Sequence, residues 1–220
     1  TVKVVLTGDG GDELFAGYDH HRRFLESNPS VTSLGDFARA YVEANCIFSD
    51  TAKRSLFTVA TRRRLAHFDA ASFAADQLDA FRDCDPINQM LALDTKMLLP
   101  GNNLVKPDKM SMAVALETRS PFLDYRLVDL AFRIPGDLKL RNGETKSVLK
   151  RAAERVLPRN IVYRPKQMFT VPIGEWFKSS LLPFVRETLL SARARERRIF
   201  DPRRVASMIC LLYTSPSPRD

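Results

Sequence analysis

The residues of this sequence that could do chemistry gather near its start, in a glycine-rich run. Asp9 and Asp12 are carboxylates of the kind that hard cations such as Mg2+ prefer. Three glycines within four positions, Gly8, Gly10 and Gly11, let the backbone turn tightly and approach a ligand. The apolar residues before the run predict a buried parallel strand, and the apolar pattern after it predicts a helix. A strand, a tight turn and a helix start together indicate a phosphate or metal site at the carboxyl edge of a sheet.

This run matches no general ligand-binding motif by itself. The dinucleotide fingerprint needs a third glycine where Glu13 stands, and the Gly-Lys-Ser/Thr of a Walker loop is missing. An EF-hand loop would place a glutamate where His20 stands. His20 and His21 could bind a metal, but neighbours on a helix point in different directions, so we expect both at the surface. A tight turn with acidic residues at a helix start remains the alternative explanation.

Two later stretches also place charges at defined positions. Glu117 and Arg119 lie beside an apolar Pro-Phe-Leu turn and would need partners if buried. Asp124 is expected to cap the next helix, so an ion pair and a cap could explain this stretch without any function. Lys146 is expected to open a helix, where a cation works against the helix dipole. A bound phosphate or carboxylate would explain that placement.

The elements that must position these residues are mostly helical. Apolar residues recur at helical spacing between Ser33 and Phe81, and this half shows no recognisable chemistry. Helix starts are expected at Asp50 and Thr61. Residues 94–103 predict a helix that ends in a Pro-Gly turn.

For four large side chains, the sequence also predicts whether they lie in the core or in a pocket wall. Met110 and Met112 should fill gaps in the core, as methionines usually do. Trp176 and Phe177 should belong to the core or to a pocket wall.

Composition describes an ordinary globular protein. The 220 residues are 45% hydrophobic and 27% charged, and no run approaches the roughly 18 apolar residues of a membrane span. No signal peptide precedes the first strand, and a chain that opens at Thr1 inside a strand is expected to be a fragment with an exposed sheet edge. Three widely spaced cysteines predict neither a disulfide framework nor a zinc site, which suits the cytoplasm.

The net charge of +8 raises the possibility of a nucleic-acid partner. Much of the surplus lies in Arg62–Arg64 and between Arg193 and Arg204. No aromatic residues that could stack on bases are interleaved with these arginines. We therefore expect solvated helix faces, with no nucleic-acid or membrane partner.

Five motifs, in one order, closely resemble the synthetase domain of glutamine-hydrolysing asparagine synthetases. They are Gly8–Tyr18, Lys109–Met112, Glu117–Asp124, Glu144–Lys146 and Tyr163–Lys166. The likeness runs from residue 1 to about Phe200. It implies an α/β fold of the PP-loop, adenine nucleotide alpha-hydrolase-like class, here mostly helical with one or few parallel strands. It also implies that Mg-ATP activates aspartate as an acyl-adenylate, which ammonia derived from glutamine then attacks.

The resemblance also implies a role for each matching residue. Asp12 would bind the Mg2+-pyrophosphate, and Asp9 would lie near the reacting carboxyl and amine. Lys146 would stabilise charge on the phosphates and at the adenylate. Glu117 would be catalytic, and Arg119 would form a charged pair with it beside the bound nucleotide. Gly8, Gly10 and Gly11 would approach the cofactor ATP with their backbone.

The sequence also departs from the family's pattern. The Ser-Gly-Gly-x-Asp-Ser ATP loop and the glutaminase domain with its N-terminal cysteine are missing. We therefore expect residues 1–209 to be part of a synthetase domain that is inactive alone, from a full-length protein that could be a homodimer. Residues 210–220 break the helical pattern and resemble sequencing-adapter read-through, with a disordered tail as the alternative.

Two further functions stay open. Relatives with this domain activate other carboxylates, so the substrate could differ from aspartate. A non-catalytic, basic helical binding module is the alternative from a different class.

Overall fold

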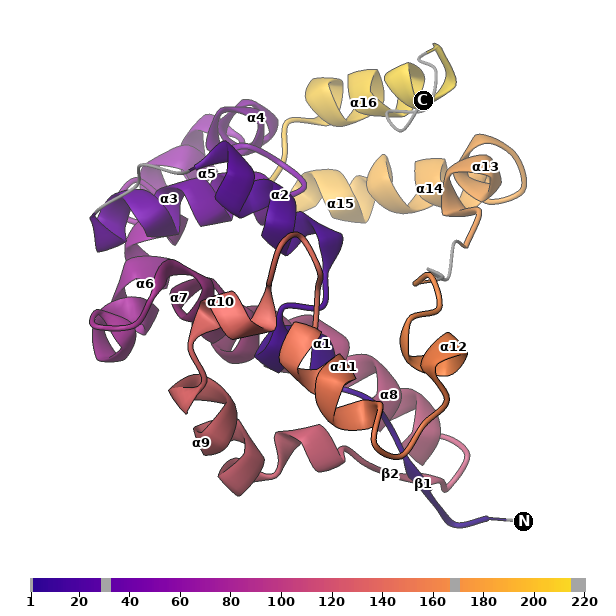
Figure 1. The fold of residues 1–220 in the computed structure, drawn as a ribbon. Coiled ribbons are helices and arrows are strands. Elements are labelled where there is room, and N and C mark those ends of the chain that lie inside the picture. Colours follow the sequence, from indigo (N-terminus) through magenta and orange to yellow (C-terminus); the bar gives the residue numbers. More distant parts are fainter. Residues whose placement is uncertain (1, 29–32, 167–170, 215–220) are drawn as a thin grey trace. The chain divides into compact units, whose positions relative to one another are not determined.

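The computed structural model describes residues 2–28, 33–166 and 171–214, which are mostly helical (Figure 1). The chain divides into two units. Unit 1 consists of residues 1–45 and 70–165, and unit 2 of residues 46–69 and 166–220.

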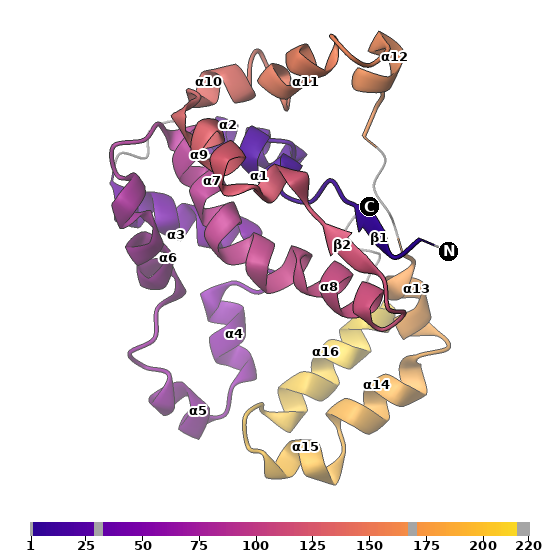
Figure 2. The same ribbon diagram turned by 90° about the horizontal axis from the view of Figure 1, so that it is seen from below.

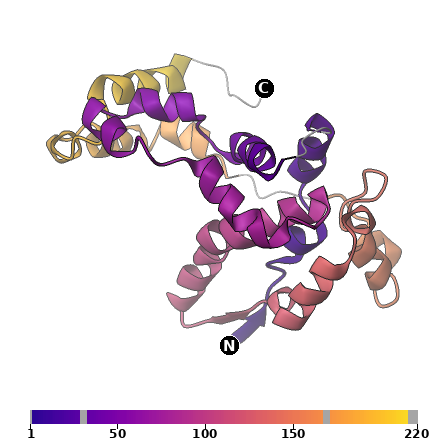
Figure 3. The same ribbon diagram turned by 90° about the vertical axis from the view of Figure 1, so that its left-hand side faces the viewer.

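A two-stranded parallel sheet lies in unit 1. Strand β1 (Val4–Leu6) lies beside β2 (Glu117–Arg119) in parallel (Figures 2 and 3). Val4 pairs with Glu117, and Leu6 pairs with Arg119. The Thr7 amide continues the pairing with a hydrogen bond to the Arg119 carbonyl (2.8 Å). The predicted parallel strand is therefore confirmed. Because both carboxyl ends lie at one edge, the glycine-rich run meets the residues that follow β2.

Helices make up most of unit 1, and side-chain caps define several of their starts. The Asp85 carboxylate caps α7, where Pro86 takes the first helical position. Asp124 caps α9 through the Arg126 amide, as predicted. The helices of unit 1 are α1 (Gly11–Phe15), α2 (Asp19–Ser27), α3 (Leu34–Asn45), α6 (Ala70–Leu78), η1 (Asp79–Phe81), α7 (Pro86–Leu93), η2 (Asp94–Asn103), α8 (Val105–Met112), η3 (Pro121–Leu123), α9 (Tyr125–Arg133), α10 (Gly136–Lys139), α11 (Ser147–Ala153) and α12 (Arg159–Val162).

The main core of unit 1 lies between α2, α3, α6 and α7. Phe24, Phe37 and Tyr41 meet edge to face, with ring centroids 5.3 and 5.9 Å from the Phe24 ring. Leu78 and Leu91 are completely buried beside them. Each such side chain contributes roughly 1.5–3 kcal/mol on burial, so this core holds the helices that carry the polar side chains.

A second, smaller core supports the glycine-rich run. Leu14 and Phe15 of α1 are buried against Ala131 of α9, and Val148 of α11 packs on the same cluster. Phe15 meets Phe122 edge to face at 6.3 Å. Helices α9 and α11 therefore hold α1 in place through this smaller core.

Unit 2 contains α4 (Asp50–Leu56), α5 (Val59–Arg64), α13 (Ile173–Lys178), α14 (Leu182–Leu189), α15 (Ala192–Glu196) and α16 (Pro202–Thr214). The Ser49 and Thr58 side chains cap α4 and α5. Two backbone hydrogen bonds join the distant segments: the Thr58 amide donates to the Ile199 carbonyl (3.0 Å), and the Asp201 amide to the Leu56 carbonyl (2.8 Å). The rings of Phe57 and Phe200 stack with centroids 5.6 Å apart. The predicted helix start at Asp50 is confirmed, and the next helix starts two residues before Thr61.

Several predicted burials are wrong. Val4 and Leu6 of β1 are 53% and 75% exposed, because no described element covers either face of the strand at these side chains. Met110 and Met112 are 68% and 54% exposed. They lie on α8, whose last turn projects beyond the core.

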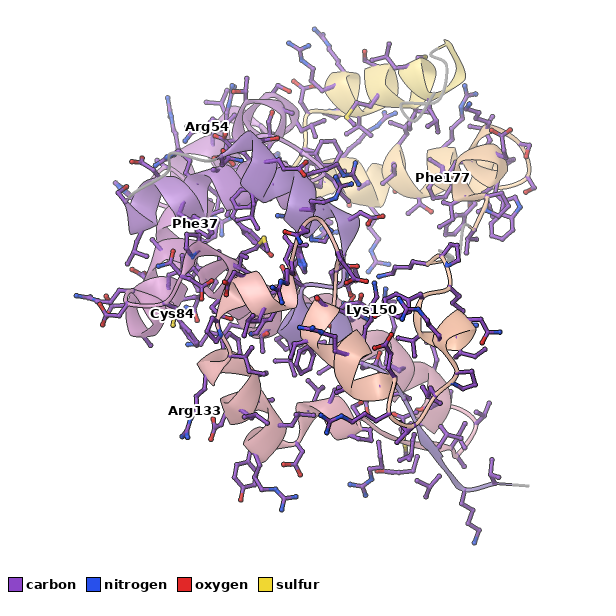
Figure 4. The ribbon with its side chains drawn as sticks, in the orientation of Figure 1. Phe37, Arg54, Cys84, Arg133, Lys150 and Phe177 are labelled. Carbon is purple, nitrogen blue, oxygen red and sulfur yellow. The ribbon has the colours of Figure 1, made fainter. Side chains whose placement is uncertain are left out.

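Trp176 and Phe177 do not lie in the core, and the alternative of a pocket wall stays a prediction. Both side chains of α13 are exposed, at 44% and 36% (Phe177 is labelled in Figure 4), so they are not core residues of unit 2. The arginine clusters do lie on solvated surface as predicted: Arg62–Arg64 and the arginines of residues 193–204 are all exposed.

The expected Pro-Gly turn at the end of residues 94–103 is wrong as well. The chain continues through Pro100 and Gly101 as a π-helix, η2, directly into α8. The Leu104 amide bonds to the Leu99 carbonyl (2.9 Å), a spacing of five residues. Since proline has no N–H to donate, the wider turn removes the need for an α-helical bond at Pro100.

The C-terminal stretch is only partly described. Helix α16 continues to Thr214, so the expected break in the helical pattern at Cys210 is wrong. Residues 215–220, where the rest of the expected tail falls, lie outside the described residues. None of the described helices combines the length and apolar character needed to cross a membrane, and the three cysteines are free thiols.

Candidate active site

The glycine-rich run forms a tight loop at the carboxyl edge of the sheet. Gly10 has φ +88°, in the left-handed region, and a Cβ there would overlap the Leu123 side chain. The Gly11 amide bonds back to the Gly8 carbonyl (3.2 Å), which closes the turn. A Cβ at Gly8 would meet nothing within 4 Å, whereas one at Gly11 would touch the Phe122 ring at 3.4 Å. Glycine is thus required by backbone geometry at Gly10 in particular.

Asp12 and Lys146 form an ion pair behind this loop. The Lys146 Nζ lies 3.1 Å from Asp12 Oδ1, and the two side chains are 29% and 22% exposed. Lys146 has φ +55° and precedes α11, and its amide donates to the Phe15 carbonyl (3.1 Å). A Cβ at Gly17 would overlap both members of the pair. The anion that the position of Lys146 predicted is therefore supplied, in this structure, by the Asp12 carboxylate.

Asp9 is held in place by neighbouring hydroxyl groups. The Thr7 hydroxyl donates to Asp9 Oδ2 (2.7 Å) and also contacts the Ser120 hydroxyl (2.9 Å). Thr7 follows β1 and Ser120 follows β2, so the parallel pairing of the two strands brings these groups together. The Asp9 carboxylate is thereby directed toward the carboxyl edge of the sheet.

A buried polar cluster lies beside the loop, and sequence reasoning missed it. The Glu13 side chain is 2% exposed, and its Oε1 accepts from the Tyr18 hydroxyl (2.7 Å) and from Asn103 Nδ2 (2.6 Å). Burial, and then the hydrogen bond to Glu13, raise the pKa of Tyr18 well above its ordinary value, so the phenol stays protonated and donates. Asn103 is 90 residues from Glu13 in the sequence, and no local pattern indicates that contact.

Two pockets open on these residues. We call the first the loop pocket, with a volume of about 340 Å³; it is lined in part by Gly8, Asp9, Asp12, Glu13, Asn103 and Lys106. We call the second the strand pocket, about 400 Å³; it is lined in part by Asp9, Leu104, Asp108, Thr118 and Ser120. Asp9 belongs to both. Lys106, which sequence reasoning did not single out, adds a cation to the loop pocket.

Glu117 and Arg119 occupy a different position. They form an ion pair with each other (Arg119 Nη2 to Glu117 Oε1, 3.2 Å) and are 44% and 69% exposed. Side chains alternate along a strand, so Thr118 and Ser120 face the strand pocket instead. The structure thus brings Gly8, Gly10, Asp9, Asp12 and Lys146 together, while Glu117 and Arg119 lie along β2 and line neither pocket.

Comparison with known proteins identifies the family. A model of the asparagine synthase family matches residues 1–214. The chain belongs to the asparagine synthase family. It is 32% identical over 216 residues to the glutamine-hydrolysing asparagine synthetase 1 of Bacillus subtilis strain 168, covering 86% of this chain and 34% of that protein. It is 29% identical over 185 residues to asparagine synthetase 3 of the same strain, covering 80% of this chain and 29% of that protein.

More distant relatives match a shorter part. The asparagine synthetase of Gallus gallus is 32% identical over 112 residues, or 46% of this chain and 20% of that protein. The chain spans about a third of the length of the two Bacillus subtilis relatives. No match was found among solved structures. Membership of the asparagine synthase family agrees with the resemblance seen in the five sequence motifs.

In this member of the family, the loop pocket combines the groups that binding an anionic nucleotide with a hard cation requires. Carboxylate oxygens of Asp9 and Asp12 are hard ligands. Lys146 and Lys106 are cations beside them, and the left-handed turn at Gly10 keeps side chains out of the loop.

Proposed function

We propose that this chain supplies part of the active site of an ATP-dependent amide-forming ligase. The reaction converts aspartate to asparagine through a β-aspartyl-AMP intermediate, with ammonia derived from glutamine. The observation that supports this most directly is the loop pocket, where Asp9, Asp12 and Lys106 converge beside a left-handed glycine turn. Lys146 does not line this pocket but reaches it through its ion pair with Asp12. Family membership supports the same reaction.

Asp12, with Asp9 close by, would hold a Mg2+ ion that the family implies. Their oxygens are the appropriate donors, and the Asp12–Lys146 contact is part-exposed and therefore exchangeable. The ion would supply charge neutralisation for the pyrophosphate that leaves.

Side chains and backbone groups of this chain would stabilise charge, accept a proton and position the nucleotide. Lys146, released from Asp12 when the phosphates bind, would stabilise the negative charge that builds up on them in the transition state. Asp9, oriented by the Thr7 hydroxyl, would accept a hydrogen bond from the attacking amine and take up its proton. The backbone of Gly8, Gly10 and Gly11 would approach the nucleotide. Glu117 and Arg119 would act as the charged pair beside the site, which requires one of them to turn from its present partner.

The remaining parts of the reaction would come from segments outside this sequence. We propose that residues 1–209 belong to an adenine nucleotide alpha-hydrolase-like domain of which β1 and β2 are two strands. The ATP loop, the glutaminase domain that delivers ammonia, and any homodimer contact of the whole protein would lie elsewhere. Residues 210–220 would not take part.

The test is a hybrid enzyme. Residues 1–209 replace the matching segment of the Bacillus subtilis asparagine synthetase 1, and pyrophosphate release is followed with ATP, Mg2+ and aspartate. The variants Lys146→Ala and Asp12→Asn are compared with Lys3→Ala, an exposed lysine that lies outside the five motifs. Loss of one oxyanion-stabilising donor typically costs about 10²–10³-fold in rate.

Aspartate-dependent release that falls by this amount in the first two variants and stays unchanged in the third would support the proposal. Release that does not depend on aspartate would retain the chemistry and assign another carboxylate substrate. A folded hybrid that binds ATP but releases no pyrophosphate would contradict the ligase function of these residues.

The distribution of charge favours a second candidate function, a basic binding module. Unit 2 contains 15 Lys and Arg against 7 Asp and Glu, a net charge of +8, whereas unit 1 contains 19 of each. If unit 2 binds polyanions, a fluorescent single-stranded oligonucleotide should bind the chain with strong salt dependence. Replacing Arg62–Arg64 by glutamine should then weaken binding. Binding that is absent at low salt would remove this candidate.

A further inference from the structure

Two histidines and an aspartate lie together in unit 1, outside the two pockets. His20 and His21 lie in the first turn of α2, and Asp94 is the first residue of η2. Helix α2 contacts α7 (Figure 2). Because α7 continues directly into η2, this packing brings the three side chains together. Each offers one ligand atom, and these atoms all lie within 4.8 Å of one another. The expectation that both histidines are surface residues is therefore wrong, because His21 is completely buried.

The geometry places both imidazoles on the same carboxylate oxygen. The Nε2 atoms of His21 and His20 lie 2.5 and 4.0 Å from Asp94 Oδ2. In a tetrahedral zinc site with bonds of about 2.1 Å, neighbouring ligand atoms are roughly 3.4 Å apart. The His21–Asp94 distance is shorter than that value and the His20–Asp94 distance is longer. Binding an ion would therefore move His21 away from Asp94 and draw His20 closer to it.

The surroundings of Asp94 resemble those of a metal ligand. Its other oxygen, Oδ1, accepts a hydrogen bond from the buried Tyr41 hydroxyl, and an outer hydrogen bond of this kind orients a ligating carboxylate. The Asp94 side chain is 0% exposed. Among the described residues, the side chains that form an ion pair with it are His20 and His21. A fully buried carboxylate is costly unless a cation compensates its charge.

We propose that His20, His21 and Asp94 bind a divalent transition-metal ion, and that zinc is the ion that best fits this donor set. Two imidazoles and one carboxylate favour zinc or its neighbours over Mg2+ or Ca2+, which prefer oxygen ligands. The His20 side chain is 39% exposed while its Nε2 atom is buried, so an ion would enter past the outer edge of the His20 ring. The site is separate from the Mg2+ proposed at Asp12.

A bound ion would also affect the loop pocket. The Tyr18 ring stacks on His20 with centroids 5.1 Å apart, and meets His21 edge to face at 5.2 Å. The Tyr18 hydroxyl donates to Glu13 in the loop pocket. Fixing the two imidazoles on an ion would therefore hold Tyr18, and through it the Glu13 carboxylate. This role for the site does not depend on the reaction proposed above.

The experiment is a titration of the metal-free, untagged full chain with Co2+ and then Zn2+. We expect one Co2+ per chain with the visible absorption of a four- or five-coordinate ion, displacement by Zn2+, and a higher Tm in Zn2+. His20→Ala removes a half-exposed ligand and should weaken Zn2+ binding by at least about tenfold, since loss of even an outer-shell partner costs that much. His67→Ala, an exposed histidine of unit 2, is the matched control and should bind as the wild type does. Asp94→Asn should abolish the absorption.

Three outcomes would overturn the proposal. The first is no stoichiometric Co2+ or Zn2+ binding by the folded wild type, which would leave a plain His21–Asp94 ion pair. The second is equal affinity in His20→Ala and His67→Ala. The third is binding that disappears when the free cysteines are alkylated, which would assign the ion to thiolates. Circular dichroism of each variant verifies that the protein is folded.

Discussion

Unit 1 and unit 2 differ in how many hydrophobic side chains they bury and in their net charge. Unit 1 has equal numbers of acidic and basic residues, and it holds every buried hydrophobic side chain of the described residues except Ile209. Unit 2 carries the whole net charge of +8. Contacts that join its two segments include two backbone hydrogen bonds, the hydrogen bond of the Thr58 hydroxyl to the Arg198 carbonyl and one stacked ring pair. The candidate chemistry lies in the unit that holds this buried core, because helices packed on a core can hold carboxylates and amides in fixed positions. The contrast predicts that unit 1 responds to changes in packing and unit 2 to changes in charge.

The largest expected effect comes from the core. Leu78→Ala in unit 1 removes a completely buried side chain and should lower the free energy of unfolding by about 2–5 kcal/mol. Leu211→Ala in unit 2 removes a side chain that is 55% exposed, and should change the free energy of unfolding by roughly 0.5 kcal/mol or less. Urea unfolding of both variants provides the measurement. Equal losses would mean that unit 2 has a core comparable with that of unit 1.

The second prediction concerns the buried cation of unit 1. The Lys139 side chain is completely buried, and its Nζ donates to Asn88 Oδ1 (2.6 Å) and lies over the Phe132 ring. Burial lowers the pKa of Lys139 from 10.5 to about 8. Between these pH values the unfolded chain binds more protons than the folded one, so stability should rise with pH across pH 8–10.5, by about 3 kcal/mol from this group.

Lys139→Met should flatten that rise, and Lys109→Met, at an exposed position, should leave it unchanged. Urea unfolding at several pH values measures both. A wild-type profile with the same slope as that of Lys139→Met would show that Lys139 does not titrate in this window.

The third prediction concerns the turn that shapes the loop pocket. Gly10→Ala must adopt φ +88° and displace Leu123, which should cost about 1–3 kcal/mol. Gly35→Ala is the matched control, because a Cβ there meets nothing within 4 Å and it lies in α3. It should be neutral or stabilising by roughly 0.5–1 kcal/mol. If thermal unfolding showed the same change in both variants, the left-handed turn would not be a special feature of the site.

The local part of the site could be predicted from the sequence. The glycine spacing, the carboxylates of Asp9 and Asp12 and the unusual place of Lys146 are all visible within a few residues. The parallel strand at Val4–Leu6 followed from the apolar run, and the resemblance to the family implied one or few such strands. Its partner at Glu117–Arg119 was not predicted. These features depend on backbone preferences that a short segment already determines.

The distant contacts could not be predicted in this way. Asn103 reaches Glu13 because η2 passes through Pro100 as a π-helix instead of ending there. Asp94 reaches His21 because α2 packs against α7, which continues into η2. Whether the helix ends or continues at Pro100 depends on tertiary packing, which here overrides the usual preference of Pro-Gly for a turn. The exposure of Val4 and Met110 depends in the same way on which elements cover them, which no short segment determines.

The smallest expected effect is the response of unit 2 to salt. Arg62–Arg64 and the arginines of residues 193–204 repel one another across its surface, and salt shortens the range of that repulsion from about 10 Å at 0.1 M to about 3 Å at 1 M. Exposed charges interact by tenths of a kcal/mol, so the expected effect of weakening their repulsion is small. Hydrogen exchange at the amides of Thr58 and Asp201, which join the two segments, should slow by about twofold when the NaCl concentration rises from about 0.1 M to about 1 M. Amides of α7 in unit 1 serve as the internal control and should not change, because their unit is neutral. If both sets of amides slowed equally, the cause would be a general salt effect on burial, and the difference in charge between the units would have no influence on their stability.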